Sequence, residues 1–163
     1  GEQASQSASA GDTSRKPRIF WMHTLPNWQH ALRDILDGPL ARCELVGDDM
    51  TFDSPMPIDM GDPVRSLARR IVENHFNGSG RRRVEATLAM AKEARADGVV
   101  VFCHWGCKQT LGLSQLAKRT FEETGLPTLV LDGDGCDERN VADGQMVTRL
   151  NAFLEQLEGR IHG

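Results

Sequence analysis

The sequence contains no tyrosine, and only 6% of its 163 residues are aromatic. The absence of tyrosine excludes phenolic acid–base chemistry in this chain. No apolar run approaches the roughly 18 residues that cross a bilayer, and the N-terminus does not show the charged and then apolar pattern of a secretion signal. We therefore expect a cytoplasmic protein that makes no membrane contact.

Cysteine is scarce as well, with four residues at irregular spacing. Four cysteines are too few for a disulfide scaffold in a chain of this size, so we expect reduced thiols. Cys103 and Cys107 are separated by three residues, which differs from the Cys-x-x-Cys spacing of zinc ribbons and thioredoxin-like motifs. Those two strong signatures are therefore missing.

Other familiar binding patterns are missing too. The 19 basic residues are outnumbered by 23 acidic ones, and this net charge of -4 argues against a general nucleic-acid binder despite the basic run 81–83. No Gly-x-Gly-x-x-Gly follows a predicted strand, and no Walker lysine pattern occurs, which excludes the standard nucleotide-binding loops. The segment 132–135, Asp-Gly-Asp-Gly, does not continue to the glutamate of an EF-hand calcium loop.

The composition supports one folded core and a tail. Residues 1–16 are rich in Ser, Ala, Gly and Gln and carry no large apolar side chain, so we expect a disordered linker or tail. Residues 17–163, in a chain that is 39% hydrophobic, can form a single α/β domain. A linker of this kind is also what remains when a domain is cut from a longer polypeptide.

Short apolar runs alternate with segments of helical periodicity along the rest of the chain. The runs predict strands at 19–22, 41–46, 99–103 and 129–132, and the periodic segments predict helices at 28–36, 63–71, 84–94, 113–121 and 146–157. Residues 48–63, rich in Pro and Asp, predict a long surface loop. Strands that alternate with helices predict an open parallel four-stranded sheet of order 2-1-3-4, with helices on both faces, as in flavodoxin-like and Rossmann-like three-layer folds.

Two of these strands end close to a cysteine. Cys107 follows the third strand and Cys136 follows the fourth, and open α/β sheets bind their ligands at this carboxyl edge. Thiolates are the ligands that soft metals and iron–sulfur clusters need. Cys107 lies in a turn and favours a ligand or a reactive thiol, whereas Cys136 is balanced between ligand and loop thiol. Cys103 and Cys43 alternate within strands, which favours core packing.

Histidines also follow strand ends. His23 and His104 could line a pocket, but a single histidine is more often only hydrogen bonded, and neither has a carboxylate partner nearby in the sequence. The sequence therefore leaves their role open.

Ordered segments resemble the C-terminal domain of the 2-hydroxyacyl-CoA dehydratase family, which includes subunits of benzoyl-CoA reductase. The resemblance extends from Arg18 to Leu157. The segments that carry it are 66–70, 77–78, 102–109 (Phe-Cys-His-Trp-Gly-Cys-Lys-Gln), 115–116, 127–134 (Pro-Thr-Leu-Val-Leu-Asp-Gly-Asp), 138–140, 144–146, 148–150 and 153–154.

The resemblance implies a cofactor and partners. Family members hold a four-iron four-sulfur cluster with three cysteines, and the cysteine of the His-Trp-Gly-Cys segment falls here on Cys107. Two further ligands come from a preceding domain that this sequence does not contain. An ATP-hydrolysing activator protein delivers single electrons, and the reduced cluster passes one to an acyl-CoA thioester. The resulting ketyl radical expels the 2-hydroxyl group, and loss of a proton with return of the electron then gives an enoyl-CoA.

The same resemblance assigns further residues. His104, Trp105 and Gln109 are expected in the substrate pocket or beside the cluster, with Cys136 and Cys103 as less favoured ligands. Lys108 and the run from Arg81 to Arg83 could meet the phosphates of coenzyme A, although solvated charge at a helix start is the alternative.

We expect the chain to be the C-terminal domain of a dehydratase subunit that pairs with a related subunit and is inactive alone, because it offers only one family-type ligand. Three alternatives remain open at this point. One is a benzoyl-CoA reductase-type subunit, and another is a non-catalytic α/β interaction module that uses the same strand-end edge. The third is a zinc site formed by Cys103, Cys107, Cys136 and His104.

Overall fold

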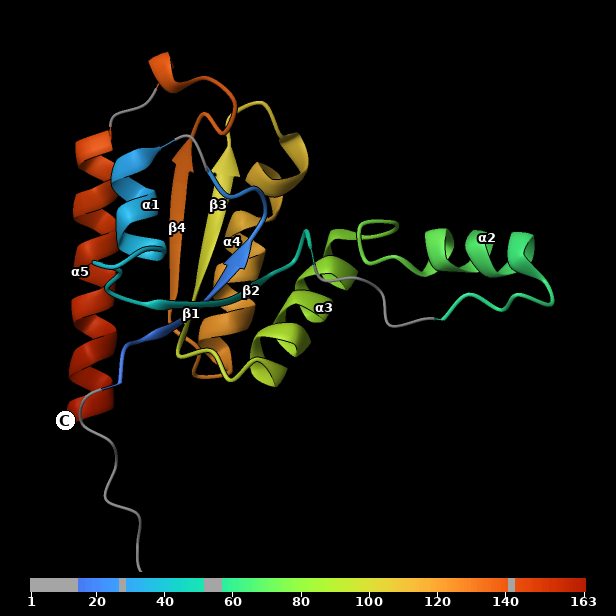
Figure 1. The fold of residues 1–163 in the computed structure, drawn as a ribbon, viewed down its shortest axis with the longest axis horizontal. Coiled ribbons are helices and arrows are strands. Elements are labelled where there is room, and N and C mark those ends of the chain that lie inside the picture. Colours follow the sequence, from blue (N-terminus) through green and yellow to red (C-terminus); the bar gives the residue numbers. More distant parts are fainter. Residues whose placement is uncertain (1–14, 27–28, 52–56, 141–142) are drawn as a thin grey trace, which may run out of the picture.

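The computed structural model describes residues 15–26, 29–51, 57–140 and 143–163. Four parallel strands form one sheet in the order β2-β1-β3-β4, as the sequence predicted (Figure 1). The strands are β1 (Arg18–Met22), β2 (Glu44–Asp48), β3 (Gly98–His104) and β4 (Thr128–Gly133). The expected disorder of residues 1–16 falls mostly outside the described residues.

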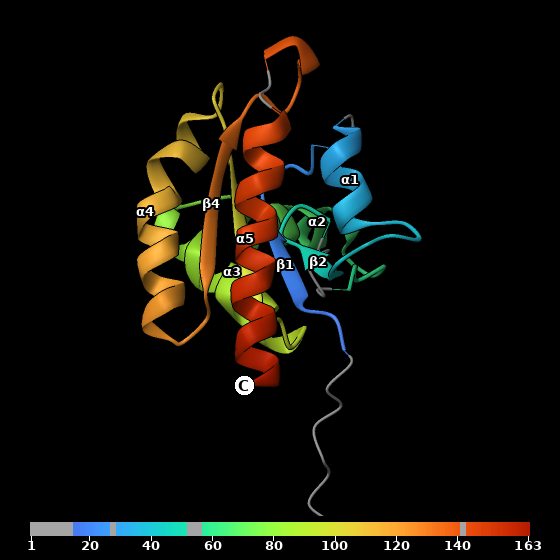
Figure 2. The same ribbon diagram turned by 90° about the vertical axis from the view of Figure 1, so that its left-hand side faces the viewer.

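Helices cover both faces of this sheet. The helices are α1 (His30–Leu36), α2 (Pro63–Glu73), α3 (Gly80–Glu93), α4 (Lys108–Glu123) and α5 (Asp143–His162), with a short 3-10 turn at Glu138–Asn140. Side chains of α1 and α5 share one buried cluster with the sheet, and those of α3 and α4 share the other. Figure 2 shows these two layers on either side of the strands, so the predicted three-layer fold is confirmed.

Strand β3 is the centre of the domain because its sequence, Gly-Val-Val-Val-Phe-Cys, is apolar on both faces. Val100 and Phe102 belong to the cluster with α1 and α5, whereas Val99, Val101 and Cys103 belong to the cluster with α3 and α4. Burial on both faces is typical of a central parallel strand. The apolar run thus brings the end of β3 to the middle of the carboxyl edge.

The largest differences from prediction lie around β2. The strand covers Glu44–Asp48 rather than 41–46, since its ladder with β1 begins at Glu44, whose N–H donates to the Pro17 carbonyl at 2.8 Å. The predicted surface loop therefore starts later. Asp48 and Asp49 are buried, and Asp48 Oδ1 accepts from the N–H groups of Met50 and Thr51. Residues 52–56 of the predicted loop lie outside the described residues.

Helix α2 begins as the sequence predicted but packs differently from the other helices. Pro63 is its first residue, and the side chain of Asp62 accepts from the Arg65 N–H at 3.3 Å. None of its residues is buried, and it extends away from the sheet in Figure 1. Arg82 of α3 donates to the carbonyls of Val72 and Glu73, which fixes the end of α2 against the start of α3.

No helix in the described ranges has the length and the apolar character that a membrane crossing requires.

Candidate functional site

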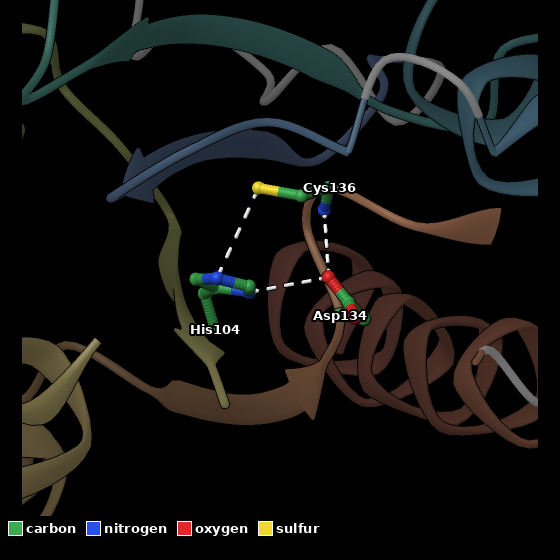
Figure 3. A group of neighbouring side chains, drawn as sticks. All are labelled: His104, Asp134 and Cys136. Carbon is green, nitrogen blue, oxygen red and sulfur yellow. Dashed lines mark hydrogen bonds and ion pairs between the residues drawn. The ribbon is translucent and has the colours of Figure 1, made fainter. Parts of the chain in front are cut away.

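The carboxyl ends of β3 and β4 lie side by side, because His104 pairs with Gly133 in the parallel register. The two chain segments that leave these strands carry the predicted ligands Cys107 and Cys136, together with Asp134, which was not predicted as a site residue. The first leads through Cys107 into α4, and the second carries Asp134 and Cys136. We call this region the strand-end site, made of His104, Cys107, Asp134 and Cys136. Figure 3 shows His104, Asp134 and Cys136.

Three of these side chains gather closely. His104, Asp134 and Cys136 each offer one ligand atom within 4.8 Å of the others, and the described ranges hold no other such group of three histidine, cysteine or acidic side chains. Asp134 Oδ1 lies 3.6 Å from His104 Nδ1, and Cys136 Sγ lies 3.9 Å from His104 Nε2. The sequence near His104 shows no carboxylate partner, but the register of β3 against β4 brings Asp134 beside it from 30 positions away.

Asp134 organises the loop that carries Cys136. Its Oδ1 accepts from the N–H groups of Cys136 at 2.9 Å and Asp137 at 3.1 Å, and its Oδ2 accepts from the Asn140 amide at 2.9 Å. These bonds, from the Asn140 side chain first and then from the Cys136 backbone, hold the pKa of Asp134 below its usual range. The loop is therefore built around an ionised carboxylate.

The position of the His104 proton follows from the same loop. The Gly135 N–H donates to His104 Nδ1 at 2.9 Å, so Nδ1 acts as an acceptor. A neutral imidazole that accepts at Nδ1 carries its proton on Nε2. The structure thus aims an N–H group at the sulfur of Cys136.

Cys107 is the N-cap residue of α4 and is partly exposed. Its sulfur lies 3.4 Å from Thr110 Oγ1. Partial burial opposes ionisation of the thiol, but hydrogen bonds from the side chain and backbone of Thr110 and the backbone of Gln109, with the charge of Arg83, leave the pKa of Cys107 below its ordinary value. A helix N-terminus favours a thiolate in the same way.

The other two cysteines lie in the core. Cys103 is 1% exposed on the face of β3 that packs against α3 and α4, and burial raises its pKa. Cys43 is 3% exposed, and burial raises its pKa to about 11. The structure therefore groups Cys136 and His104 with Asp134, and not with Cys103 as the zinc alternative required.

The predicted pocket residues lie at the same edge. Trp105 is 53% exposed, and its backbone N–H donates to the Gly133 carbonyl at 3.0 Å, which links the residue after β3 to the end of β4. Lys108 and Gln109 are exposed in the first turn of α4. Arg81 is exposed at the start of α3.

Arg83 departs from the expectation of solvated charge at a helix start. It is completely buried, and its Nη2 lies 2.8 Å from Asp49 Oδ2. Within the run of three arginines, the sequence letters alone do not distinguish the buried Arg83 from the exposed Arg81 and Arg82. A helical wheel would have revealed it, because Arg83 lies one turn before Thr87 and two turns before Met90 on the buried face of α3.

Comparison with known proteins identifies the family of the chain. A family model described as 2-hydroxyglutaryl-CoA dehydratase, D-component, matches residues 2–157. The chain belongs to this family.

Curated relatives carry the names of dehydratase subunits. Lactoyl-CoA dehydratase subunit alpha of Anaerotignum propionicum is 28% identical over 101 residues, which are 61% of this chain and 24% of the relative. The (R)-phenyllactyl-CoA dehydratase alpha subunit of Clostridium sporogenes is 38% identical over 69 residues, which are 42% of this chain and 17% of the relative. The matched part therefore spans about a quarter or less of these relatives, and the sequence resemblance to 2-hydroxyacyl-CoA dehydratases is confirmed.

Proposed function

We propose that this D-component domain supplies Cys107 as one ligand of a four-iron four-sulfur cluster in a 2-hydroxyacyl-CoA dehydratase. The observation that carries the proposal is the placement of Cys107. Cys107 is the N-cap residue of α4 at the carboxyl edge of the sheet, and its thiol is partly exposed with a lowered pKa. Iron–sulfur clusters are held by cysteine thiolates, and a helix N-terminus stabilises that form.

The positions of the four cysteines are consistent with a single cluster ligand from this domain. Cys43 and Cys103 are buried in the core, so their sulfurs face packed side chains. Cys136 is exposed and lies against His104, where it can neighbour a cluster or serve as a spare thiol. The remaining ligands come, in this proposal, from residues outside the chain.

Bound in this way, the cluster supplies a single low-potential electron and an open iron that acts as a Lewis acid on the thioester carbonyl. The domain holds the Cys107 thiolate and presents His104, Trp105 and Gln109 at the same edge. Lys108 and Arg81 are exposed cations that can meet the phosphates of coenzyme A. Removal of water from acyl-CoA is favoured over ring reduction because the relatives named above are dehydratase subunits.

The proposed partners are a related subunit, an ATP-hydrolysing activator protein that donates electrons, and an acyl-CoA substrate, all in the cytoplasm. The names of the relatives, which are alpha subunits, support a second subunit. The isolated domain is expected to be inactive, because one thiolate cannot hold a cluster alone.

The test is anaerobic reconstitution of the longest natural polypeptide that contains this chain, with iron and acid-labile sulfide counted per protein. We expect Cys107→Ser to lose most of both. Cys43→Ser, which removes a buried thiol far from the carboxyl edge, is the matched control and should keep them. Full iron and sulfide in the Cys107→Ser protein would refute the proposal.

A single thiophilic cation is the second candidate, favoured by the grouping of His104, Asp134 and Cys136. Zinc accepts sulfur, imidazole nitrogen and carboxylate oxygen ligands. Coordination by His104 Nε2 requires its proton to move to Nδ1, where the Gly135 N–H must give way. Titration with Co²⁺ alone tests this site. A sulfur-to-cobalt absorption band that Cys136→Ser removes and Cys107→Ser leaves unchanged would support it, and no band would exclude it.

A further inference from the structure

The buried ion pair between Arg83 and Asp49 lies directly behind the strand-end site. Arg83 is the one buried lysine or arginine among the described residues, and Asp49 is completely buried as well. Arg83 Nε and Nη2 lie 2.9 and 2.8 Å from Asp49 Oδ2. Desolvating two charges costs free energy that such a pair only partly recovers, and replacing it with apolar residues is often neutral or stabilising. A buried pair of this kind therefore calls for a role beyond stability.

Asp49 ties the pair to the sheet. Its Oδ1 accepts from the backbone N–H of His23 at 2.6 Å, just after β1, and its Oδ2 accepts from Thr87 Oγ1 of α3 at 3.3 Å. Asp49 itself follows β2 directly, and its N–H donates to the Trp21 carbonyl at 3.1 Å. The carboxylate thus holds Arg83 in a fixed place relative to the ends of β1 and β2.

The other side of the guanidinium faces the start of α4. Arg83 Nη1 lies 3.4 Å from Gln109 Oε1 and 3.4 Å from Thr110 Oγ1. Thr110 Oγ1 lies 3.4 Å in turn from Cys107 Sγ. Each contact is long for a hydrogen bond, but together they form a continuous path from Asp49 through Arg83 and Thr110 to the thiol.

We propose that Arg83, oriented by Asp49, is the positioning residue of the Cys107 ligand. The inference rests on the proposed function and adds a role for a residue that touches neither substrate nor cluster. Arg83 holds the first turn of α4 through Thr110 and Gln109, and it places a positive charge in the low-dielectric interior behind the thiolate. The planar guanidinium of arginine can contact Asp49 on one side and the first turn of α4 on the other, whereas the single ammonium group of lysine cannot.

Two consequences follow for a cluster held by Cys107. A positive charge nearby stabilises the reduced cluster, which carries one more negative charge, so its removal lowers the reduction potential. Loss of the contacts to Thr110 and Gln109 changes the orientation of the Cys107 thiol even without a cluster. A residue that only supported the fold would change neither quantity in a folded variant.

The experiment compares Arg83→Lys with the double variant Arg83→Met/Asp49→Asn, which removes both charges and leaves no unpaired buried ion. Lys92→Met removes an exposed charge from the same helix and serves as the control. The protein is the longest natural polypeptide. The reconstituted form gives the midpoint potential and the electron paramagnetic resonance signal of the reduced cluster. The metal-free form gives the alkylation rate of Cys107 relative to exposed Cys136, and circular dichroism verifies the fold.

In the folded double variant we expect a lower midpoint potential and at least about a threefold change in the Cys107 to Cys136 alkylation ratio. We expect Arg83→Lys to keep the midpoint potential of the wild type but to change the alkylation ratio. Lys92→Met should change neither quantity. An unchanged potential and ratio in the folded double variant would overturn the inference. The two proposals can fail separately. A cluster that persists in Cys107→Ser would refute the proposed function, whereas the alkylation ratio of the metal-free protein tests the role of Arg83 with or without a cluster.

Discussion

The Asp134 carboxylate lies 3.6 Å from the His104 imidazole, in a loop that the Gly135 N–H joins to the end of β3 by donating to His104 Nδ1. Its three other partners, Cys136, Asp137 and Asn140, all belong to that loop. One carboxylate therefore fixes the shape of the loop, and the bond from Gly135 to His104 fixes the distance of the loop from β3.

Replacing Asp134 with alanine should loosen this loop. The N–H groups of Cys136 and Asp137 lose their acceptor, so we expect their amide hydrogens to exchange faster with deuterium. Glu122→Gln, an exposed change on α4 that affects only a pair with Lys118, is the control. Equal exchange rates at 135–137 in the Asp134→Ala protein and the wild type would contradict this role.

Gly106 should not tolerate a side chain. A Cβ atom at this position would lie 2.8 Å from His104 Nε2, the atom that contacts Cys136, so the ring of His104 must shift. We expect Gly106→Ala to shift the nuclear magnetic resonance signals of the His104 ring and to lower the free energy of unfolding by about 1–2 kcal/mol.

Gly112 is the matched position, because a Cβ atom there meets nothing within 4 Å on α4. Gly112→Ala should raise the free energy of unfolding by about 0.5–1 kcal/mol, since alanine favours a helix interior. A similar response of the two variants in urea unfolding would show that the contact with His104 does not matter.

The four thiols should differ in reactivity. At pH 8, iodoacetamide should modify Cys107 and Cys136, because both are accessible and the pKa of Cys107 is lowered. Cys43 and Cys103 should stay unmodified, because burial covers them and raises their pKa values. Mass spectrometry of digested protein measures each site, and denaturant should make all four react. Early modification of Cys103 in the folded protein would count against the described core.

Stability should fall in acid partly because of His23. Burial, followed by the charge of Arg83, lowers the pKa of His23 from 6.5 to about 4. The unfolded chain therefore binds a proton at a higher pH than the folded chain does. Stability from this group is present above about pH 6.5 and is lost as the pH falls toward about 4, by on the order of 1–2 kcal/mol once solvent screening is included.

Asparagine is the suitable replacement for this test. His23 has a φ of 81°, a left-handed conformation that asparagine tolerates well. Urea unfolding from pH 7 to pH 4 should therefore show a smaller loss of stability in His23→Asn than in the wild type. Identical slopes in the two proteins would remove His23 as the cause.

Apolar residues of α2 and of the core should respond very differently to substitution. Ile71 and Val72 are 64% and 66% exposed, so serine at either position should change the free energy of unfolding by less than about 0.5 kcal/mol. Phe102 is completely buried against Trp21, and its replacement by alanine should cost about 3–5 kcal/mol. Chemical denaturation measures both, and a large cost for Ile71→Ser would mean that α2 is covered in solution.

The sheet order and layers were predictable because they depend on local patterns. The apolar run of β3, the helical spacing of the later segments and the Asp62-Pro63 start of α2 are each visible over a few residues. Parallel strands joined by helices then leave few topologies. The position of Cys107 beyond β3 follows from the same reasoning.

Long-range pairs were not predictable in this way. Arg83 and Asp49 are 34 positions apart, and nothing near either residue indicates the other. The contact of His104 with Asp134 depends on the register of β3 against β4, which a strand assignment alone does not specify. The exposure of the apolar face of α2 was not predictable either, because its helical pattern is the same as that of a helix packed against a core.

The parallel arrangement puts both ends of the described fold on the side away from Cys107 and Cys136. Strand β1 starts at Arg18 on the amino edge of the sheet, and α5 ends on the same side in Figure 1. The five residues of β1 span about 17 Å. A fluorescent reporter or affinity tag fused at either end should therefore leave the carboxyl edge with Cys107 and Cys136 uncovered.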